Sequence, residues 1–203
     1  MKWTIIIKIL HMLSKIISEI EESIKVKSDI INDKSLLLKI ESLANEVLTS
    51  INNGGKIMFC GNGGSFADSQ HLAAEFVSRL RFDRGPLPSI ALGTNSSNIT
   101  AIANDYGYEE VFSREIIAIG KEADILIPIS TSGNSKNILK AIKSAKDKQI
   151  KVIGLSGKNG GEMKNLCDLI LVPSESTEKI QESHIMIGHI VCSIVEYEYF
   201  LKR

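Results

Sequence analysis

Apolar residues follow two different patterns along the chain, one before and one after residue 55. From Met12 to about Ile51 they recur at steps of three and four residues, which is the spacing of amphipathic helices. Asn32-Asp33 interrupts this pattern and Asn52-Asn53-Gly54-Gly55 ends it. The first part of the chain therefore predicts two helices.

Beyond residue 55, short apolar runs alternate with helical stretches. The expected strands are Lys56–Cys60, Ser89–Leu92, Asp124–Ile129, Lys151–Leu155 and Leu169–Val172. The expected helices lie near Ala67–Arg81, Asn98–Ala103, Glu110–Ile119, Asn137–Lys148 and from about Glu178 to Leu201. Because the strands are apolar on both faces, this order favours an α/β fold with a parallel sheet covered on both sides. We predict a single domain over 1–203, with N-terminal helices over 1–55 and the core over 56–203.

Composition and charge exclude several classes of protein. The chain has 24 basic and 24 acidic residues, so it offers no electrostatic case for nucleic acid or an anionic membrane. Its three cysteines show neither metal-like nor disulfide-like spacing, which favours a reduced, cytoplasmic location. The opening MKWTIIIKILHML is too short to span a bilayer, and no small-residue cleavage site follows it.

Two further expectations concern the ends of the chain. The opening segment is either the front of the first helix or an extension from an upstream start codon, with Met12 as the alternative start, and we favour the second interpretation. The leading helices and the last helix carry more apolar surface than a monomer needs, so an oligomer is predicted.

Two loops of small residues carry the first chemical signal. Cys60-Gly61-Asn62-Gly63-Gly64-Ser65 follows the first strand, and Ser130-Thr131-Ser132-Gly133-Asn134-Ser135 follows the third. Loops of this kind at strand carboxyl ends present backbone N–H groups, hydroxyls and helix N-termini, which suit the phosphate of a sugar phosphate. Neither loop matches a Walker or Rossmann fingerprint. The alternative is that Ser65 and Ser135 only cap the helices that follow.

Three residue pairs and groups beyond these loops could also act in a site. His71 and Glu75 lie one helical turn apart and could ligate one divalent ion, or form a surface pair. Gln181, His184 and His189 stand among apolar residues of the last helix, where a histidine is more often a core residue than a ligand. Asn104-Asp105 is either a turn or a group that meets sugar hydroxyls.

Taken together, these residues resemble a known family. The first loop, Asp68-Ser69-Gln70-His71-Leu72-Ala73-Ala74-Glu75-Phe76, Asn104-Asp105-Tyr106-Gly107, the second loop and Ile180-Gln181-Glu182 are similar to the phosphoheptose isomerase branch of the sugar isomerase (SIS) domain superfamily. The resemblance runs from about Met12 to the C-terminus. It implies a three-layer αβα sandwich with a five-stranded parallel sheet, flavodoxin-like in architecture, with extra N-terminal helices.

The resemblance also implies an activity: conversion of sedoheptulose 7-phosphate to D-glycero-D-manno-heptose 7-phosphate in activated heptose biosynthesis for lipopolysaccharide or capsule. It implies a homotetramer with active sites at subunit contacts. One zinc ion per subunit is expected, held by residues matching His71, Glu75, Gln181 and His189. The implied substrate contacts are Asn62, Gly63, Gly64, Ser65, Glu75, Asn104, Asp105, Ser130, Thr131, Ser132, Ser135 and Gln181.

An aldose–ketose isomerase needs a base to move the carbon-bound proton and an acid for the oxygens. Glu75 is the candidate base and His189 the candidate acid, because two groups of different type can serve both roles near neutral pH. The rival hypothesis is a non-catalytic phosphosugar-binding or replication-initiator-associating protein of the same fold, which His189 argues against. An isomerase of a hexose or pentose phosphate stays open.

Two departures from the family pattern stand out. Lys179 occupies a position where the family usually has arginine, and lysine keeps the charge but loses the bidentate fork. Phe66 stands where many relatives have a small or polar residue, and we expect it to narrow the mouth of the pocket.

Overall fold

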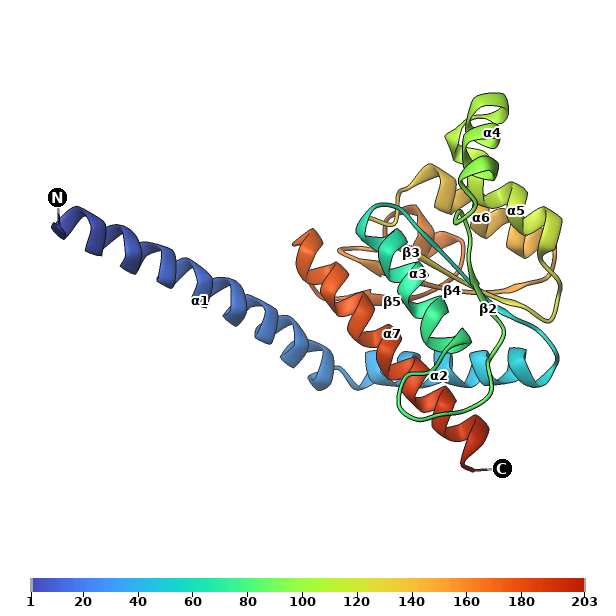
Figure 1. Ribbon diagram of the computed structural model, residues 1–203, viewed down its shortest axis with the longest axis horizontal. Coiled ribbons are helices and arrows are strands. Elements are labelled where there is room, and N and C mark those ends of the chain that lie inside the picture. Colours follow the sequence, from blue (N-terminus) through green and yellow to red (C-terminus); the bar gives the residue numbers. More distant parts are fainter. Residues whose placement is uncertain (1, 203) are drawn as a thin grey trace.

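The computed structural model describes residues 2–202 of the chain, with side chains described from residue 11. The helix α1 spans Lys2–Asn32 and α2 spans Lys34–Asn52. They part at the predicted break, where the side chain of Asp33 caps α2 by accepting a hydrogen bond from the backbone N–H of Leu36 at 3.0 Å. In the backbone, the segment before Met12 is the front of α1, while the choice of start codon stays a prediction. Figure 1 shows α1 projecting away from the rest of the molecule.

The five predicted strands form one sheet in which every pair is parallel. They are β1 (Ile57–Gly61), β2 (Ser89–Ala91), β3 (Ile125–Ser130), β4 (Lys151–Gly157) and β5 (Asp168–Val172), in the spatial order β2-β1-β3-β4-β5. The order of strands reverses between β1 and β3, which is where open α/β sheets bind ligands.

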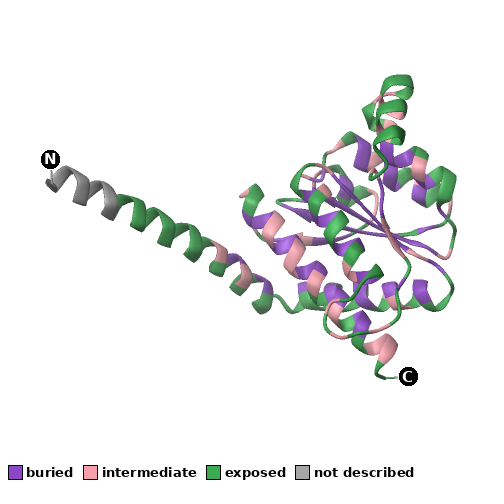
Figure 2. Ribbon diagram, in the orientation of Figure 1, coloured by how far each residue is buried: buried purple, intermediate pink, exposed green. Residues whose placement is uncertain are grey.

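Helices cover both faces of the sheet, as predicted for a three-layer sandwich (Figure 1). The remaining helices are α3 (Gly64–Val77), α4 (Ser96–Tyr106), α5 (Val111–Ile119), α6 (Lys136–Asp147) and α7 (Thr177–Phe200), with short 3-10 turns over Tyr108–Glu110 and Gly161–Asn165. One apolar cluster joins the sheet to α2, α3 and α7, and a second joins it to α5 and α6. Figure 2 shows buried residues concentrated in the strands and on the helix faces toward them.

The bounds predicted for α3 were wrong at both ends. The helix begins at Gly64 instead of Ala67, because Gly63 takes a positive φ of 55° and turns the chain directly from the strand into the helix. It ends at Val77 instead of Arg81, where Ser78 leaves the helical conformation. The guanidinium of Arg84 then satisfies the carbonyls of Glu75 and Phe76, so the last turn needs no further helical residues.

The helix α4 is longer than predicted. Asn95 caps it by accepting hydrogen bonds from the backbone N–H groups of Ser97 and Asn98. At its other end the helix runs on to Tyr106, so Asn104 and Asp105 lie in its last turn and not in a turn of their own, while their contact with sugar hydroxyls stays a prediction. Among the described residues, no helix is long and apolar enough to cross a membrane.

Candidate active site

The two small-residue loops meet because the strands that carry them are neighbours. Gly61 at the end of β1 is in register with Ile129 at the end of β3. Across this gap the side-chain amides of Asn62 and Asn137 pair reciprocally, each donating to the other at 2.9 and 2.8 Å. The hydroxyl of Tyr108 also donates to Asn62 Oδ1 at 3.1 Å. The first loop is therefore tied to the start of α6 and to the segment after α4.

The serine hydroxyls of these loops are not used as helix caps. The N-cap position of α3 is Gly63, and Ser65 lies within the helix. Ser135 occupies the N-cap position of α6 but makes no capping hydrogen bond, and its Oγ lies 3.2 Å from Ser130 Oγ. The capping alternative is thus wrong for Ser65, whereas Ser135 holds the N-cap position but its hydroxyl makes no capping hydrogen bond. The first turns of α3 and α6 follow adjacent strand ends, where their free N–H groups favour an anion.

Glycines at two positions allow a close approach to the loops. Gly133 has a φ of +67°, and a Cβ there would lie 2.1 Å from the carbonyl oxygen of Gly160. A Cβ on Gly64 would lie 3.3 Å from Cδ of Gln181, so the carboxamide of Gln181 rests directly on the first loop. This contact brings α7 to the loop that begins α3.

Three side chains from α3 and α7 converge next to this contact. His71 Nε2 lies 2.8 Å from His189 Nε2 and 3.2 Å from Glu75 Oε1. One potential ligand atom from each of the three residues lies within 4.8 Å of the other two. Two nitrogens and one carboxylate oxygen in such a cluster are ordinary donors for zinc, so the group fits a divalent metal. The His71–Glu75 pair expected from the sequence is present and is extended by His189 into a possible metal-binding group.

Gln181, the fourth predicted ligand, is held by an acid that the sequence reasoning missed. Its Nε2 donates to Asp68 Oδ1 at 2.7 Å, so the carboxamide oxygen is the atom of Gln181 that can coordinate a metal ion. Asp68 is buried, and burial raises the pKa of its carboxyl group against the opposing effect of the Gln181 hydrogen bond. Its spacing three residues before His71 puts both on one face of α3, which is the signal that could have identified it.

The other predicted site residues differ in how far they are exposed. Asn104 and Asp105 are exposed, and Asn104 donates to Asp105 at 2.8 Å. Thr131 and Ser132 are half-buried in the second loop, where Ser132 Oγ accepts from the backbone N–H of Asn134. The structure brings His71, Glu75 and His189 into one group and holds Gln181 of α7 at Asp68, one turn before His71 on α3, whereas Asn104 and Asp105 lie on α4.

The structure also places Lys179 and Phe66, the two residues that depart from the family pattern, and His184, the other histidine of α7. Lys179 is only 8% exposed in its side chain and pairs with Glu19 of α1 at 3.0 Å. Phe66 lines a cavity of about 100 Å³ beside Asn62 and Tyr108. His184 is fully buried and donates Nε2–H to the carbonyl of Ser156 at 3.1 Å, and burial lowers its pKa to about 4. It is a neutral core histidine.

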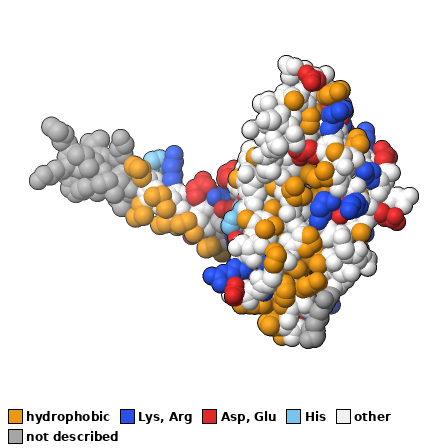
Figure 3. Space-filling model, turned by 45° about the vertical axis from the view of Figure 1, so that its right-hand side comes forward, with side chains coloured by type: hydrophobic (Ala, Val, Ile, Leu, Met, Phe, Trp, Pro, Cys, Tyr) orange, Lys and Arg blue, Asp and Glu red, His pale blue; other side chains and the backbone are white. Residues whose placement is uncertain are grey.

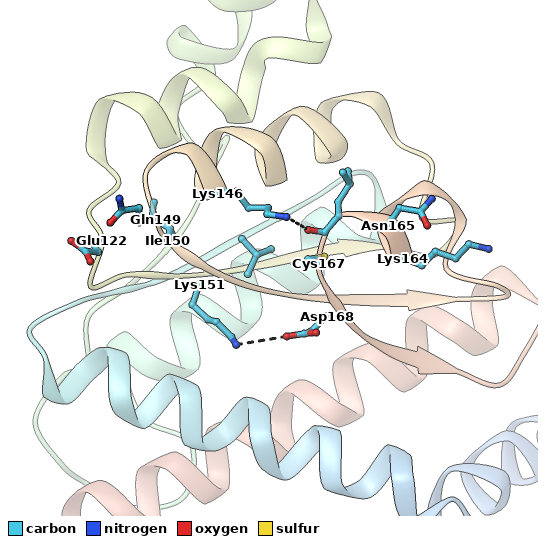
Figure 4. A pocket seen from close by; sticks show the side chains of 11 residues that line it. Glu122, Lys146, Gln149, Ile150, Lys151, Lys164, Asn165, Cys167 and Asp168 are labelled. Atoms are coloured by element: carbon cyan, nitrogen blue, oxygen red, sulfur yellow. Dashed lines mark hydrogen bonds and ion pairs between the residues drawn. The ribbon is translucent and has the colours of Figure 1, made fainter.

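A larger hollow, of about 750 Å³, lies at the amino-terminal ends of β4 and β5, at the opposite end of the strands from the two loops (Figure 4). Figure 4 shows Lys151 extending toward Asp168, 3.7 Å away, and Lys146 donating to the backbone carbonyl of Leu166. Because these cations are already paired within the chain, and because ligands of such sheets bind at strand carboxyl ends, we assign no site to this hollow.

The fold and the two small-residue loops define the class of protein. The family described as "SIS domain" matches residues 8–157 of the chain. Among curated relatives, phosphoheptose isomerase of Clostridium acetobutylicum is 53% identical over 92% of this chain and 95% of its own length. That of Aneurinibacillus thermoaerophilus is 55% identical over 92% of this chain and 94% of its own. A solved phosphoheptose isomerase from Francisella tularensis has a TM-score of 0.85 and 38% identity, covering 90% of this chain and 97% of its own. The chain belongs to the phosphoheptose isomerase family.

Proposed function

We propose that this isomerase converts sedoheptulose 7-phosphate to D-glycero-D-manno-heptose 7-phosphate in activated heptose biosynthesis for lipopolysaccharide or capsule. The observation that carries the proposal is the His71–Glu75–His189 group beside the two paired loops, in a chain about half identical to phosphoheptose isomerases. The reaction moves one proton between adjacent carbons and one between their oxygens. A site for it needs a phosphate anchor, an acid and a base.

The phosphate anchor is formed by the second loop. Ser130, Thr131, Ser132 and Ser135 supply hydroxyl donors, and the first turn of α6 supplies backbone N–H groups. The sugar hydroxyls meet the first loop at Asn62, Gly63, Gly64 and Ser65, with Asn104, Asp105 and Gln181 completing the contacts. The amide pair of Asn62 and Asn137 supports this role, because it keeps the two loops at one fixed separation.

We assign zinc as the metal of the site, and His71, Glu75, Gln181 and His189 would hold it. The mixed nitrogen and oxygen donor set and the bond from Gln181 to Asp68 support this assignment. A bound zinc ion would polarise the substrate carbonyl and stabilise negative charge on its oxygen. His71 and Gln181 would only hold the ion, while Glu75 and His189 also act on protons.

Glu75 is the base that takes the carbon-bound proton and returns it to the adjacent carbon. His189 is the acid that moves the proton between the two oxygens, so the reaction passes through a cis-enediol. A carboxylate held tightly by a cation is a weak base, so Glu75 would be at most a loose ligand of a bound ion. Arg84 holds the backbone carbonyl of Glu75, so only the side chain can move between these roles.

The protein acts as a cytoplasmic homotetramer, with active sites at the contacts between subunits. Along α1 an apolar stripe is exposed: Met12, Leu13, Ile16, Ile17, Ile20 and Ile24. Figure 3 shows hydrophobic side chains gathered along the described part of the projecting helix. A helix face of this kind is stabilised when a second copy covers it. Light scattering of the purified protein tests this assembly, and a monomer at micromolar concentration would contradict it.

The activity is tested with chelator-treated protein to which single metal ions are returned. Sedoheptulose 7-phosphate, a ketohexose phosphate and a ketopentose phosphate are each supplied, and the aldose product is measured. We expect turnover of the heptulose only, restored best by zinc. Turnover of a shorter phosphosugar instead would assign a different substrate, and binding of the sugar without turnover would assign the non-catalytic role.

A further inference from the structure

The candidate site stands next to a buried ion pair that belongs to neither loop. Arg84, from the segment between α3 and β2, places Nε 2.9 Å from Glu196 Oε1 of α7. The two side chains are 3% and 1% exposed. Removing two charges from water costs several kcal/mol per ion, so a buried pair is weak evidence for a role in stability alone. Its partners indicate what else it does.

Both side chains of the pair are fully engaged with the backbone around the end of α3. Arg84 donates through Nη2 to the carbonyl of Glu75 at 2.8 Å, and through Nη1 to the carbonyl of Phe76 at 2.7 Å. Glu196 accepts from the backbone N–H groups of Leu80 and Arg81 at 3.1 and 2.8 Å. The pair therefore closes the last turn of α3 and ties the following segment to α7.

The pair is also connected to His71, Glu75 and His189, the candidate metal-binding group. Glu196 follows His189 by seven residues, about two turns, so both project from one face of α7 toward α3. Glu75 belongs to the group itself, and its own carbonyl oxygen is bound by Arg84. A continuous series of contacts thus runs from the backbone of Glu75 through Arg84 and Glu196 to the helix that carries His189.

We propose that the Arg84–Glu196 pair is a positioning device that fixes Glu75 relative to His189. Neither residue touches the substrate. Their function is to hold the end of α3 on α7 while the Glu75 side chain changes partners. A guanidinium is needed because one planar group bonds the Glu196 carboxylate and the carbonyls of Glu75, Phe76 and Gly85, whereas an ammonium offers only three donors from a single atom. The inference rests on the proposed zinc-dependent isomerisation.

The test compares Arg84→Lys with the double variant Arg84→Met/Glu196→Leu, which removes both charges at similar volume. The matched control is Glu198→Gln, which removes the exposed Lys202–Glu198 pair two residues further along α7. Zinc affinity is measured by chelator competition, kcat and KM with sedoheptulose 7-phosphate at saturating zinc, and folding by thermal unfolding. We expect both Arg84 variants to lose about tenfold or more in zinc affinity or kcat, with KM little changed and the control like wild type.

Two results would overturn the inference. A folded Arg84→Lys protein with a lower melting temperature but wild-type zinc affinity and kcat would reduce the pair to a structural role. The same profile in the double variant would do so independently of the lysine. Failure of the proposed function is recognised separately, because then the wild-type protein itself neither binds zinc nor turns over the heptulose.

Discussion

Gly188 of α7 lies directly against Leu72 of α3: a Cβ on this glycine would stand 2.4 Å from Leu72 Cδ2. The two helices that carry the metal-binding group therefore cross at a point where no side chain can be added. We expect Gly188→Ala to force the helices apart, to lower the free energy of unfolding by about 1–3 kcal/mol, and to weaken zinc binding.

The measurement for Gly188→Ala is chemical denaturation together with zinc titration. Gly85→Ala is the matched control, because a Cβ there meets no atom within 4 Å and its φ is not positive. If Gly188→Ala matched this control in both measurements, the close crossing would not be what sets the metal geometry.

The amide pair between Asn62 and Asn137 gives a second prediction. Asn137 is buried, so Asn137→Ala leaves the Asn62 amide without its partner and lets the first loop move relative to the second. We expect KM to rise by about tenfold, equivalent to about 1.4 kcal/mol of lost substrate binding, with a smaller effect on kcat. Steady-state kinetics with sedoheptulose 7-phosphate measure both values. A fall in kcat at unchanged KM would assign Asn137 to the chemical step instead.

Asp68 gives a third prediction, because it holds the amide of Gln181 by a single hydrogen bond. Asp68→Asn keeps an oxygen acceptor for that bond, whereas Asp68→Ala removes it. We therefore expect Asp68→Ala to weaken zinc binding by about tenfold or more and Asp68→Asn to weaken it less. Equal losses in the two variants, measured by chelator competition, would show that the charge of Asp68 matters more than the orientation of Gln181.

His184 predicts a dependence of stability on pH. Burial lowers its pKa to about 4 from an ordinary value of 6.5, so the unfolded chain binds one more proton than the folded chain between these values. The free energy of unfolding therefore rises with pH across this window. As pH falls from 6.5 to 4, the contribution of His184 lowers it by about 3 kcal/mol. Denaturation of wild type and His184→Gln at several pH values checks this. An unchanged pH slope in the variant would contradict it.

Much of the fold could be predicted because its signals are local. The apolar runs at Ile125–Ser130 and Lys151–Gly157 stand out as strands whatever surrounds them, and Asn32-Asp33 marks a helix break by its own chemistry. The bounds of α3 could not be predicted in this way. Its last turn is closed by Arg84, a residue outside the helix, and its start depends on the positive φ of Gly63.

The residues of the candidate site likewise divide into those with a local signal in the sequence and those without one. The spacing of His71 and Glu75 is visible within one helix, and their pairing with His189 follows only once α3 and α7 are packed together. Asn137 and Arg84 carry no local signal, because their partners are about 75 and 112 residues away in the chain. The resemblance to a known family implied the proposed set of four ligands, which spacing alone left open.

Proton exchange with solvent tests the central claim, that Glu75 moves the carbon-bound proton of the substrate, most directly. Zinc-loaded wild type and Glu75→Gln are each incubated with sedoheptulose 7-phosphate in D₂O and followed by proton NMR. The account predicts an aldose carrying deuterium at C2 for wild type, and a loss of roughly a hundredfold or more in both turnover and exchange for the variant. Near-normal turnover and deuterium incorporation by Glu75→Gln would contradict it.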